Sequence, residues 1–341
     1  MTADEGDRFG ALQALLGDVY AASLAVERPS IVLAALDAGL FEACGEPVAR
    51  STLMLATTAA PDVVTAVLDA LVVLDVLEPR EGDLLVATET WRPFCTPDGR
   101  VLLRDALGLG EARARLLRHA LSGRGWTSDE QDLVAVARGV TWNPGTDLAV
   151  HLRRRAAQNV PEIAAALDGG GRYLELGCGV GGALLALVRA FPSTTAVGVE
   201  LAPELAALAT RTATELGLAD RVRIVVGDAG DFHDADGFDV CFWSQFFFPA
   251  DSRAGALAAA LAALRPGGVL VAPAPDVRLP HAGPYDDEAR DNATERVLWA
   301  TWRVPALTPD ELVAEAVAAG FTSVRLASGA HVTTLVARAP A

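Results

Sequence analysis

The stretch that decides the fold is RYLELGCGVGG, residues 172–182, near the middle of a chain of 341 residues. Its first five residues are largely apolar and typical of a buried strand, whereas Gly182 begins an apolar run long enough for a helix. The glycines between them let the backbone turn tightly and lie against a ligand with no side chain in the way. The stretch therefore predicts a strand, a ligand-binding glycine loop and a helix.

Strands and helices alternate from this stretch to the C-terminus. Further strands are expected at 195–200, 221–226, 238–243, 269–272, 323–326 and 332–337, with helices between most of them. One helix begins at Thr308, where a threonine and Glu311 form a capping-box pattern. This alternation predicts an α/β fold, a doubly wound, Rossmann-like parallel sheet over residues 166–341.

The chain before the glycine loop has a different pattern of predicted elements. Residues 1–105 contain short helical patterns followed by two apolar runs, 76–77 and 84–86, which a Pro-Arg-Glu-Gly-Asp turn separates. Helices followed by a hairpin predict a mostly helical, winged-helix-like domain. Residues 106–165 are expected to be a helical connector that covers the active site.

Acidic side chains mark the ends of three predicted strands. Glu175 lies in the first strand, Glu200 ends the second and Asp228 follows the third. In a doubly wound sheet the ligand lies at the carboxyl ends of the strands. These three carboxylates are therefore expected to converge on one ligand beside the glycine loop.

The glycine spacing alone leaves two cofactor classes open. Gly177, Gly179 and Gly182 also satisfy the GxGxxG dinucleotide pattern, in which Glu200 would bind an NAD ribose. In that case, however, the negative charge of Glu175 would lie near the pyrophosphate of NAD. The position of the loop also argues against NAD, because the loop lies in the middle of the chain, behind a helical domain. Three acids favour a cofactor that has no phosphate and carries an ammonium and a sulfonium cation.

These motifs resemble those of a known family. ELGCGVG (175–181) resembles motif I of the class I methyltransferases, and Glu200, Asp228 and LRPGG (264–268) match that family's later landmarks in order and spacing. LAALDAGLF (33–41) resembles the dimerisation domain of the small-molecule O-methyltransferases. The resemblance covers most of the chain and is strongest over residues 170–270.

The resemblance implies that S-adenosylmethionine is the cofactor. Glu200 would accept hydrogen bonds from both ribose hydroxyls, Asp228 with the Ala229 backbone would hold the adenine, and Glu175 would face the ammonium. The glycine loop would approach the methionine part. The expected cofactor-binding residues are Glu175, Gly177, Cys178, Gly179, Glu200, Leu201, Asp228, Ala229 and Ser244.

The family's usual catalytic base is missing from its place. O-methyltransferases that the chain resembles commonly carry a histidine after the fourth strand, which here falls near Phe246 in SQFFFP (244–249). The catalytic candidates are therefore His281, as a base, and Gln245, which can orient a substrate but not take its proton. An acceptor that is already ionised, or that is methylated on a nitrogen or carbon atom, could react without a base. Methylation of oxygen is therefore the first expectation, with nitrogen and carbon as alternatives. Five aromatic residues either wall the acceptor site or pack in the core: Phe246, Phe247, Phe248, Trp299 and Trp302.

The composition excludes several functions. A formal net charge of -16 is unfavourable for nucleic-acid binding. The chain contains no lysine, which excludes Schiff-base chemistry and a Walker-type phosphate loop. Its four cysteines and five histidines show no metal-ligand spacing, so no metal is expected. Without an apolar run of about 18 residues or a signal peptide at the N-terminus, we expect a cytoplasmic protein that does not enter membranes.

We therefore predict a methyltransferase for a small molecule, of the kind found in secondary-metabolite pathways, that forms a homodimer through its N-terminal domain. The first alternative keeps the cofactor but uses it for chemistry other than methyl transfer. The others are an NAD-dependent oxidoreductase and a DNA-binding regulator. The last is disfavoured by the acidic composition of residues 47–83.

Overall fold

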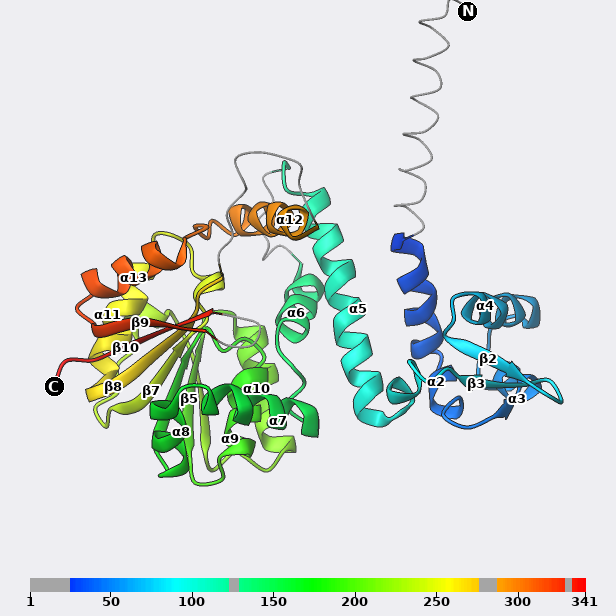
Figure 1. The fold of residues 1–341 in the computed structure, drawn as a ribbon, viewed down its shortest axis with the longest axis horizontal. Coiled ribbons are helices and arrows are strands. Elements are labelled where there is room, and N and C mark those ends of the chain that lie inside the picture. The colour runs from blue at the N-terminus through cyan, green and yellow to red at the C-terminus, as the bar shows by residue number, and fades with distance from the viewer. Residues whose placement is uncertain (1–24, 123–128, 276–286, 329–332) are drawn as a thin grey trace, which may run out of the picture. The chain divides into compact units, whose positions relative to one another are not determined.

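The computed structural model describes residues 25–122, 129–275, 287–328 and 333–341. The chain divides into two compact units, residues 1–107 and 108–341, and the division falls within helix α5 (Pro97–Arg118) (Figure 1). The sequence predicts a boundary at 105/106 and a separate connector up to 165. In the structure, the connector's residues from 108 onward belong to the second unit.

The first unit combines short helices with a small antiparallel sheet. Its sheet has the strand order β1-β3-β2, and β2 and β3 pair as a hairpin, as the two apolar runs predict. Its core gathers apolar side chains such as Phe41, Leu53, Leu68 and Leu85. Its elements are helical residues 25–37, α2 (Leu40–Ala43), β1 (Val48–Ala49), α3 (Arg50–Leu55), α4 (Pro61–Val73), β2 (Leu77–Arg80), β3 (Leu84–Ala87) and the short 3-10 helix η1 (Arg92–Cys95).

The second unit is built on a seven-stranded sheet. Its strands are β4 (Arg172–Leu176), β5 (Thr195–Glu200), β6 (Val222–Val226), β7 (Phe238–Trp243), β8 (Leu264–Pro273), β9 (Thr322–Ser328) and β10 (Thr333–Arg338). Its helices are α6 (Glu130–Gly139), α7 (Asp147–Gln158), α8 (Pro161–Asp168), α9 (Gly182–Ala190), α10 (Pro203–Glu215), α11 (Arg253–Ala263), α12 (Asp287–Thr301) and α13 (Pro309–Ala318), with the short 3-10 helices η3 (Ala229–Asp231) and η4 (Gln245–Phe247). The capping box at Thr308 begins α13 as expected.

The strand order of this sheet is β6-β5-β4-β7-β8-β10-β9. The first five strands in that order pair in parallel, so the predicted doubly wound sheet is confirmed. Only β10 runs antiparallel to its neighbours β8 and β9, because four residues between β9 and β10 allow a hairpin but no crossover. The order reverses between β4 and β7, and a crevice is expected at the carboxyl ends of these two strands.

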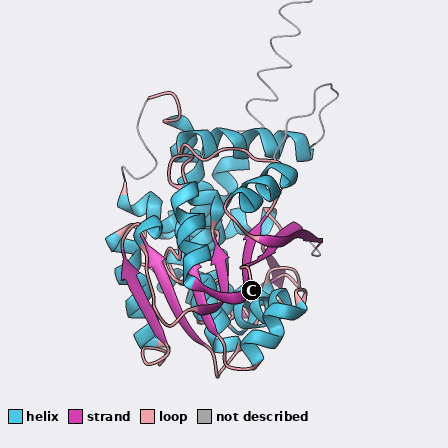
Figure 2. Ribbon diagram, turned by 90° about the vertical axis from the view of Figure 1, so that its left-hand side faces the viewer, coloured by secondary structure: helices cyan, strands magenta, loops and turns pink. Residues whose placement is uncertain are grey.

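Helices cover both faces of the sheet, and the alternation of side chains along β4 decides which residue faces which layer (Figures 1 and 2). Leu174 and Leu176 pack with residues of α11 and α13. Tyr173 packs with residues of α7, α8 and α9 on the other face. Because side chains two apart lie on one face of a strand, Glu175 shares the face of Tyr173.

A third apolar cluster lies above the carboxyl ends of the strands. It joins Ala112 of α5, Val136 of α6 and Trp299 of α12, and aromatic residues of η4 pack against it. We call the parts of α5, α6 and α12 in the second unit the roof. No helix among the described residues is both long enough and apolar enough to cross a membrane.

Candidate active site

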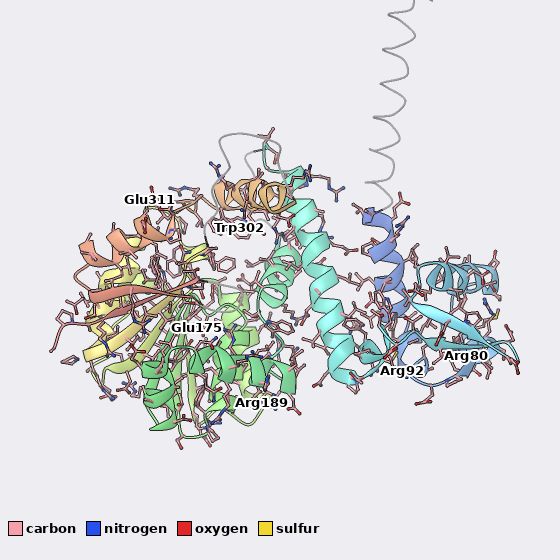
Figure 3. All side chains as sticks on the ribbon, in the orientation of Figure 1. Arg80, Arg92, Glu175, Arg189, Trp302 and Glu311 are labelled. Carbon is pink, nitrogen blue, oxygen red and sulfur yellow. The ribbon has the colours of Figure 1, made fainter. Side chains whose placement is uncertain are left out.

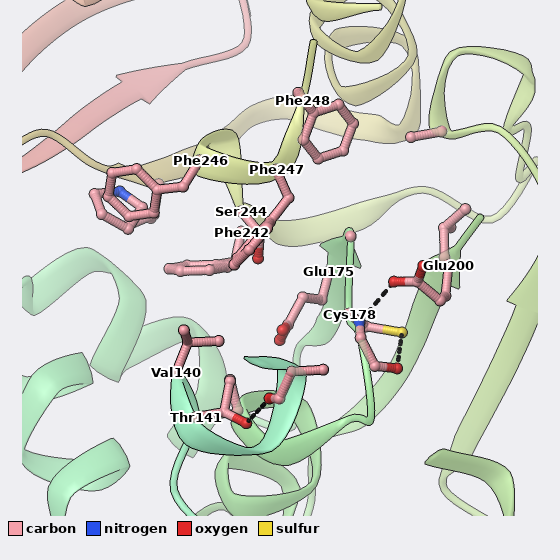
Figure 4. A pocket seen from close by; sticks show the side chains of 18 of the residues that line it. Val140, Thr141, Glu175, Cys178, Glu200, Phe242, Ser244, Phe246, Phe247 and Phe248 are labelled. Carbon is pink, nitrogen blue, oxygen red and sulfur yellow. Dashed lines mark hydrogen bonds between the residues drawn. The ribbon is translucent and has the colours of Figure 1, made fainter. Parts of the chain in front are cut away.

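A cavity of about 1080 Å³ opens in the second unit where the sheet meets the roof (Figure 4). The segments that follow β4, β5, β6 and β7 line it on one side and roof side chains on another, and residues of α7 and α8 line it as well. A volume of this size is in the range of small-molecule sites. All nine residues predicted to bind the cofactor line it: Glu175, Gly177, Cys178, Gly179, Glu200, Leu201, Asp228, Ala229 and Ser244.

The glycine loop between β4 and α9 has a backbone that only glycine adopts easily. Gly177, Gly179 and Gly181 have φ values of 74°, 55° and 75°. A Cβ atom on Gly177 would lie 2.9 Å from Cε2 of Phe248, which is too close for a side chain. The amide of Gly177 donates to the carbonyl of Val199 on β5, which fixes the loop against the neighbouring strand. The missing side chains leave the loop backbone accessible from the cavity.

Glu200 is the last residue of β5, and its carboxylate accepts hydrogen bonds from two backbone segments: the glycine loop and the turn that follows β5. Its Oε2 accepts a hydrogen bond of 2.7 Å from the amide of Gly179, and its Oε1 accepts one of 2.9 Å from the amide of Ala202 (Figure 4). Burial raises the pKa of this carboxyl, and the backbone donors work against that rise. A carboxylate accepts about four hydrogen bonds in all, so Glu200 retains capacity for a ligand hydroxyl beside its backbone donors.

Glu175 is a buried carboxyl at the centre of the cavity wall. Its side chain is 1% exposed, and Figure 4 shows it directed into the cavity. The hydroxyl of Tyr173 donates to its Oε2 at 3.2 Å, and among the described residues it forms no ion pair. Burial raises the pKa of Glu175 to about 7, although the nearby Arg153 and the Tyr173 hydroxyl lower it. A buried carboxylate that forms no ion pair among the described residues fits a ligand that brings a positive charge of its own.

Asp228 follows β6 and lies at the edge of the cavity. Its Oδ1 accepts a hydrogen bond of 2.8 Å from the amide of Gly230 and caps η3. Among the described residues, its other oxygen accepts no hydrogen bond. Ala229 beside it is buried and lines the cavity. Leu201, next to Glu200, lines the cavity with an unusually exposed apolar side chain.

These positions fit S-adenosylmethionine. Three carboxylates lie around a bare glycine loop, and one of them, Glu175, is buried and forms no ion pair among the described residues. Glu200 and Asp228 can each accept further hydrogen bonds. The same arrangement fits NAD poorly, because a pyrophosphate on the loop would meet the buried Glu175. Groups of three or more side chains suited to a metal ion are absent from the described part of the chain.

Unlike the predicted cofactor-binding residues, neither predicted catalytic residue is found among the described residues that line the cavity. Gln245 is buried and does not line the cavity: its Nε2 donates to the carbonyl of Pro273 and its Oε1 accepts from Arg253 at 3.1 Å. Both ends of the side-chain amide therefore serve the packing between η4, β8 and α11, and a role for Gln245 in orienting a substrate stays a prediction. His281 lies outside the described residues.

The five aromatic residues fulfil both roles that the sequence leaves open. Phe246, Phe247, Phe248, Trp299 and Trp302 all line the cavity. They also pair within the core, with ring centroids 5.3 Å apart for Phe246 and Trp299 and 5.5 Å apart for Phe247 and Trp302. The position at which a histidine base is expected is thus an aromatic wall residue, Phe246.

Sequence reasoning missed several residues of the cavity. Tyr173 could have been found, because it lies two residues before Glu175 on the same strand face. Arg153 of α7 and the ion-paired Arg113 and Glu295 of the roof gave no local signal. Arg113 and Glu295 are 182 residues apart, and only the fold brings them together.

Comparison with known proteins agrees with this geometry. Residues 174–268 match the family model described as a methyltransferase domain. The curated carboxy-S-adenosyl-L-methionine synthase of Chromohalobacter salexigens is 39% identical over 106 residues, which make up 30% of this chain and 39% of that protein. The match therefore spans about two fifths of that relative's length.

The likeness in structure extends over nearly the whole chain. An O-methyltransferase family protein from Burkholderia thailandensis has a TM-score of 0.70 at 17% identity, over 96% of this chain and 98% of that one. Mitomycin 7-O-methyltransferase has a TM-score of 0.62 at 19% identity, over 98% and 99%. Human N-acetylserotonin methyltransferase, solved in complex with SAM, has a TM-score of 0.67 at 15% identity, over 97% and 98%.

Residues 174–268 are therefore similar to a methyltransferase domain, and the chain as a whole has the fold of these solved O-methyltransferase structures.

Proposed function

We propose that this protein is an S-adenosylmethionine-dependent methyltransferase that acts on a small molecule of secondary metabolism. The observation that carries the proposal is the convergence of Glu175, Glu200 and Asp228 on one cavity beside the glycine loop. The methyltransferase-domain match and the names of the structural neighbours support it.

Each site residue has a definite task in this proposal. Glu200 accepts hydrogen bonds from the ribose hydroxyls, Asp228 and the Ala229 backbone hold the adenine, and Glu175 faces the ammonium. Cys178, Leu201 and Ser244 shape the walls of the same half of the cavity. When bound, the cofactor supplies an electrophilic methyl group on a sulfonium.

The chain contributes to the reaction mainly by alignment and by exclusion of water. The aromatic wall from Phe246 to Phe248, with the roof above it, surrounds an acceptor with apolar side chains. Correct alignment of two reactants alone is worth up to about 7–11 kcal/mol of the barrier in favourable cases. The cavity-lining residues that the structure describes include no histidine. Oxygen is the first expectation for the methylated atom, with nitrogen or carbon as alternatives, and His281 is retained as the candidate base.

Calorimetry on the full chain tests the cofactor. We expect one molecule of S-adenosylmethionine, or one of S-adenosylhomocysteine, to bind per protein chain, and we expect NAD not to bind. Binding of NAD, with neither adenosyl compound bound, would overturn the proposal.

A second candidate keeps the cofactor and changes the reaction. It is favoured by the match to a relative whose name describes synthesis of a carboxylated form of the cofactor. Mass spectrometry of turnover mixtures separates the two. Methyl transfer yields S-adenosylhomocysteine one for one with methylated product, whereas the second candidate yields a modified cofactor and no methylated acceptor.

We further propose a homodimer formed through the first unit. That unit exposes large apolar side chains on its helices: Val26, Leu55, Val63 and Val73. A contiguous apolar patch marks an interaction surface, and the proposal takes these side chains to form one. We keep the expectation of a cytoplasmic enzyme as part of the same proposal.

A further inference from the structure

We propose that Arg153 of α7 holds the carboxylate of the cofactor's amino-acid end, so that Arg153 and Glu175 together require an ammonium and a carboxylate on the same ligand. The inference rests on the proposed function, because it assigns a further residue to the cofactor of that reaction. The residues assigned to the cofactor so far, which are three carboxylates and the glycine loop with its neighbours, include no cation for this carboxylate.

Arg153 lies on the side of α7 that faces the sheet. Val150 and Ala157, which are three residues before it and four after it, pack in the same apolar cluster as Tyr173 of β4. Residues at these spacings share one face of a helix, so the side chain of Arg153 leaves α7 on that face. Figure 3 shows Glu175 in the interior of the second unit, and both Arg153 and Glu175 line the cavity.

The charge of Arg153 acts on Glu175 although the two side chains form no ion pair. Burial raises the pKa of Glu175, and Arg153 is the strongest of the influences that lower it. Arg153 also lowers the pKa of the Tyr173 hydroxyl, which burial raises. Among the described residues, however, Arg153 forms no hydrogen bond and no ion pair. A cation and a buried anion therefore lie within each other's field in one cavity wall, and neither has a protein group of opposite charge in contact.

The next residue along α7 shows how an arginine of this helix is used for structure. Arg154 donates to the carbonyl of Ala190 at 2.7 Å and to Asp168 at 3.5 Å, and its guanidinium lies 5.2 Å from the centroid of the Phe191 ring. These contacts fasten α7 to its surroundings and account for that charge. Arg153 has no such contacts, so its guanidinium is available to a ligand.

Other arginines of the cavity wall are less suited to this task. In the described part of the chain, Arg113 lines the cavity but is already paired with Glu295. Arg155 lines it from an exposed position on α7. Arg153 is the arginine whose charge acts on the buried Glu175.

The chemistry of an amino acid connects the two charges. Its ammonium and its carboxylate are attached to one carbon atom, so a wall that places the ammonium at Glu175 receives the carboxylate close by. A charge taken out of water needs a partner of opposite sign. A guanidinium supplies that partner and can donate two parallel hydrogen bonds to a carboxylate. The pair of Arg153 and Glu175 thus matches both charges of the cofactor's amino-acid end.

Calorimetry on the full chain with three thioethers tests the inference. S-adenosylhomocysteine carries both charges, its decarboxylated analogue carries the ammonium alone, and 5′-methylthioadenosine carries neither. All three share the adenosine and a neutral sulfur, so their affinities differ through the amino-acid end. We expect the wild type to bind S-adenosylhomocysteine at least about tenfold more tightly than either of the others, because hydrogen bonds to charged groups contribute that much.

Two changes at Arg153 make the test specific. Arg153→Met removes the charge and is expected to weaken S-adenosylhomocysteine about tenfold or more, while the other two compounds bind within about threefold of their wild-type affinities. Arg153→Lys keeps a positive charge and is expected to retain part of the preference for the carboxylate. Arg211→Met, at an exposed position of α10 outside the cavity wall, is the matched control.

Glu175→Gln gives the complementary pattern, because it is expected to weaken both compounds that carry the ammonium and to spare 5′-methylthioadenosine. The titrations are made at about pH 8.5, where Glu175 stays ionised even after the loss of Arg153 has raised the pKa of its carboxyl.

Two results at Arg153→Met overturn the inference and leave the proposed function standing. One is an unchanged affinity for S-adenosylhomocysteine, and the other is an equal loss for all three compounds, which indicates a structural role. Failure of the wild type to bind S-adenosylhomocysteine overturns the proposed function itself. The same set of titrations therefore distinguishes the two failures.

Discussion

At the scale of single residues, Glu200 combines a structural role with a proposed role in cofactor binding. Its two oxygens already hold the amides of Gly179 and Ala202, so the carboxylate is fixed before a ligand arrives. A preorganised acceptor loses little entropy on binding. The same residue therefore shapes the glycine loop and, in the proposed function, accepts hydrogen bonds from the cofactor.

We expect Glu200→Ala to weaken S-adenosylmethionine binding by at least about tenfold, because two ribose hydroxyls lose their acceptor. Calorimetry measures the effect. Glu204→Ala, an exposed change on α10 that does not line the cavity, is the control and is expected to bind normally. Equal affinities for the two variants would remove Glu200 from the cofactor site.

Glu175 predicts a pH dependence of cofactor binding. Because burial raises its pKa to about 7, the carboxyl is increasingly protonated, and so unable to pair with an ammonium, as the pH falls below 7. Affinity for S-adenosylmethionine is expected to fall about tenfold per pH unit below that point. Glu175→Gln is expected to bind weakly and without this dependence. Tyr173→Phe removes a hydrogen bond that lowers the pKa, so the fall should begin at higher pH.

The same carboxyl acts on the stability of the ligand-free protein in the opposite direction. A pKa raised on folding contributes stability that is present below the unfolded value of 4.5 and is lost as the pH rises through about 7. Bound cofactor is expected to offset this loss near neutral pH, since it pairs with the ionised form.

His281 is the remaining residue-scale prediction. If alignment supplies most of the acceleration, His281→Ala retains measurable methyl transfer, with a loss of no more than about 10²–10⁴-fold. Activity and calorimetry are measured together. Complete loss of activity with normal cofactor binding would make His281 an essential base.

At the scale of elements, a buried polar network connects η4 with its surroundings. Arg253 of α11 is 2% exposed, forms two hydrogen bonds with Glu315 of α13 and donates to both the carbonyl and the side chain of Gln245. Its guanidinium also lies 4.6 Å from the centroid of the Trp243 ring. This network positions the segment from which Phe246, Phe247 and Phe248 reach the cavity.

Arg253→Ala is expected to destabilise the second unit by about 3 kcal/mol, because it leaves partly buried polar partners unpaired. Urea unfolding followed by tryptophan fluorescence measures this loss. The exposed pair of Arg303 with Asp251 is the control, and Arg303→Ala is expected to cost less than about 1 kcal/mol. If the two variants lose similar amounts of unfolding free energy, the buried network stabilises the unit no more than an exposed ion pair does.

At the scale of the whole molecule, the two units carry different parts of the proposal. The methyltransferase-domain match falls entirely within the second unit, and so does the cavity. The net charge of -16 of the whole chain is unfavourable for nucleic-acid binding. Its proposed task is association between copies.

We expect sedimentation to give twice the chain mass of 35.5 kDa at micromolar concentration. The variant Leu55→Glu with Val73→Glu adds charge to two exposed apolar positions of the first unit and is expected to shift the protein to the monomer. A control with Val317→Glu, an exposed position of α13 in the second unit, is expected to stay dimeric. A wild type that sediments only as a monomer contradicts the proposal.

The sheet and the cofactor half of the cavity could be predicted from the sequence. Apolar runs, glycines and strand-end acids are local patterns, and parallel strands bring their carboxyl ends to one edge whatever the rest of the chain does. For this reason Glu175, Glu200 and Asp228 line one cavity as expected.

The acceptor half depended on the tertiary structure. Gln245 follows a strand end like the acids, yet its side chain turns to Arg253 and Pro273, because the packing of α11 and β8 decides its direction. Arg113 and Glu295 meet only because two helices cross above the sheet. Contacts between side chains far apart in sequence follow the path of the chain in space, which no local pattern encodes.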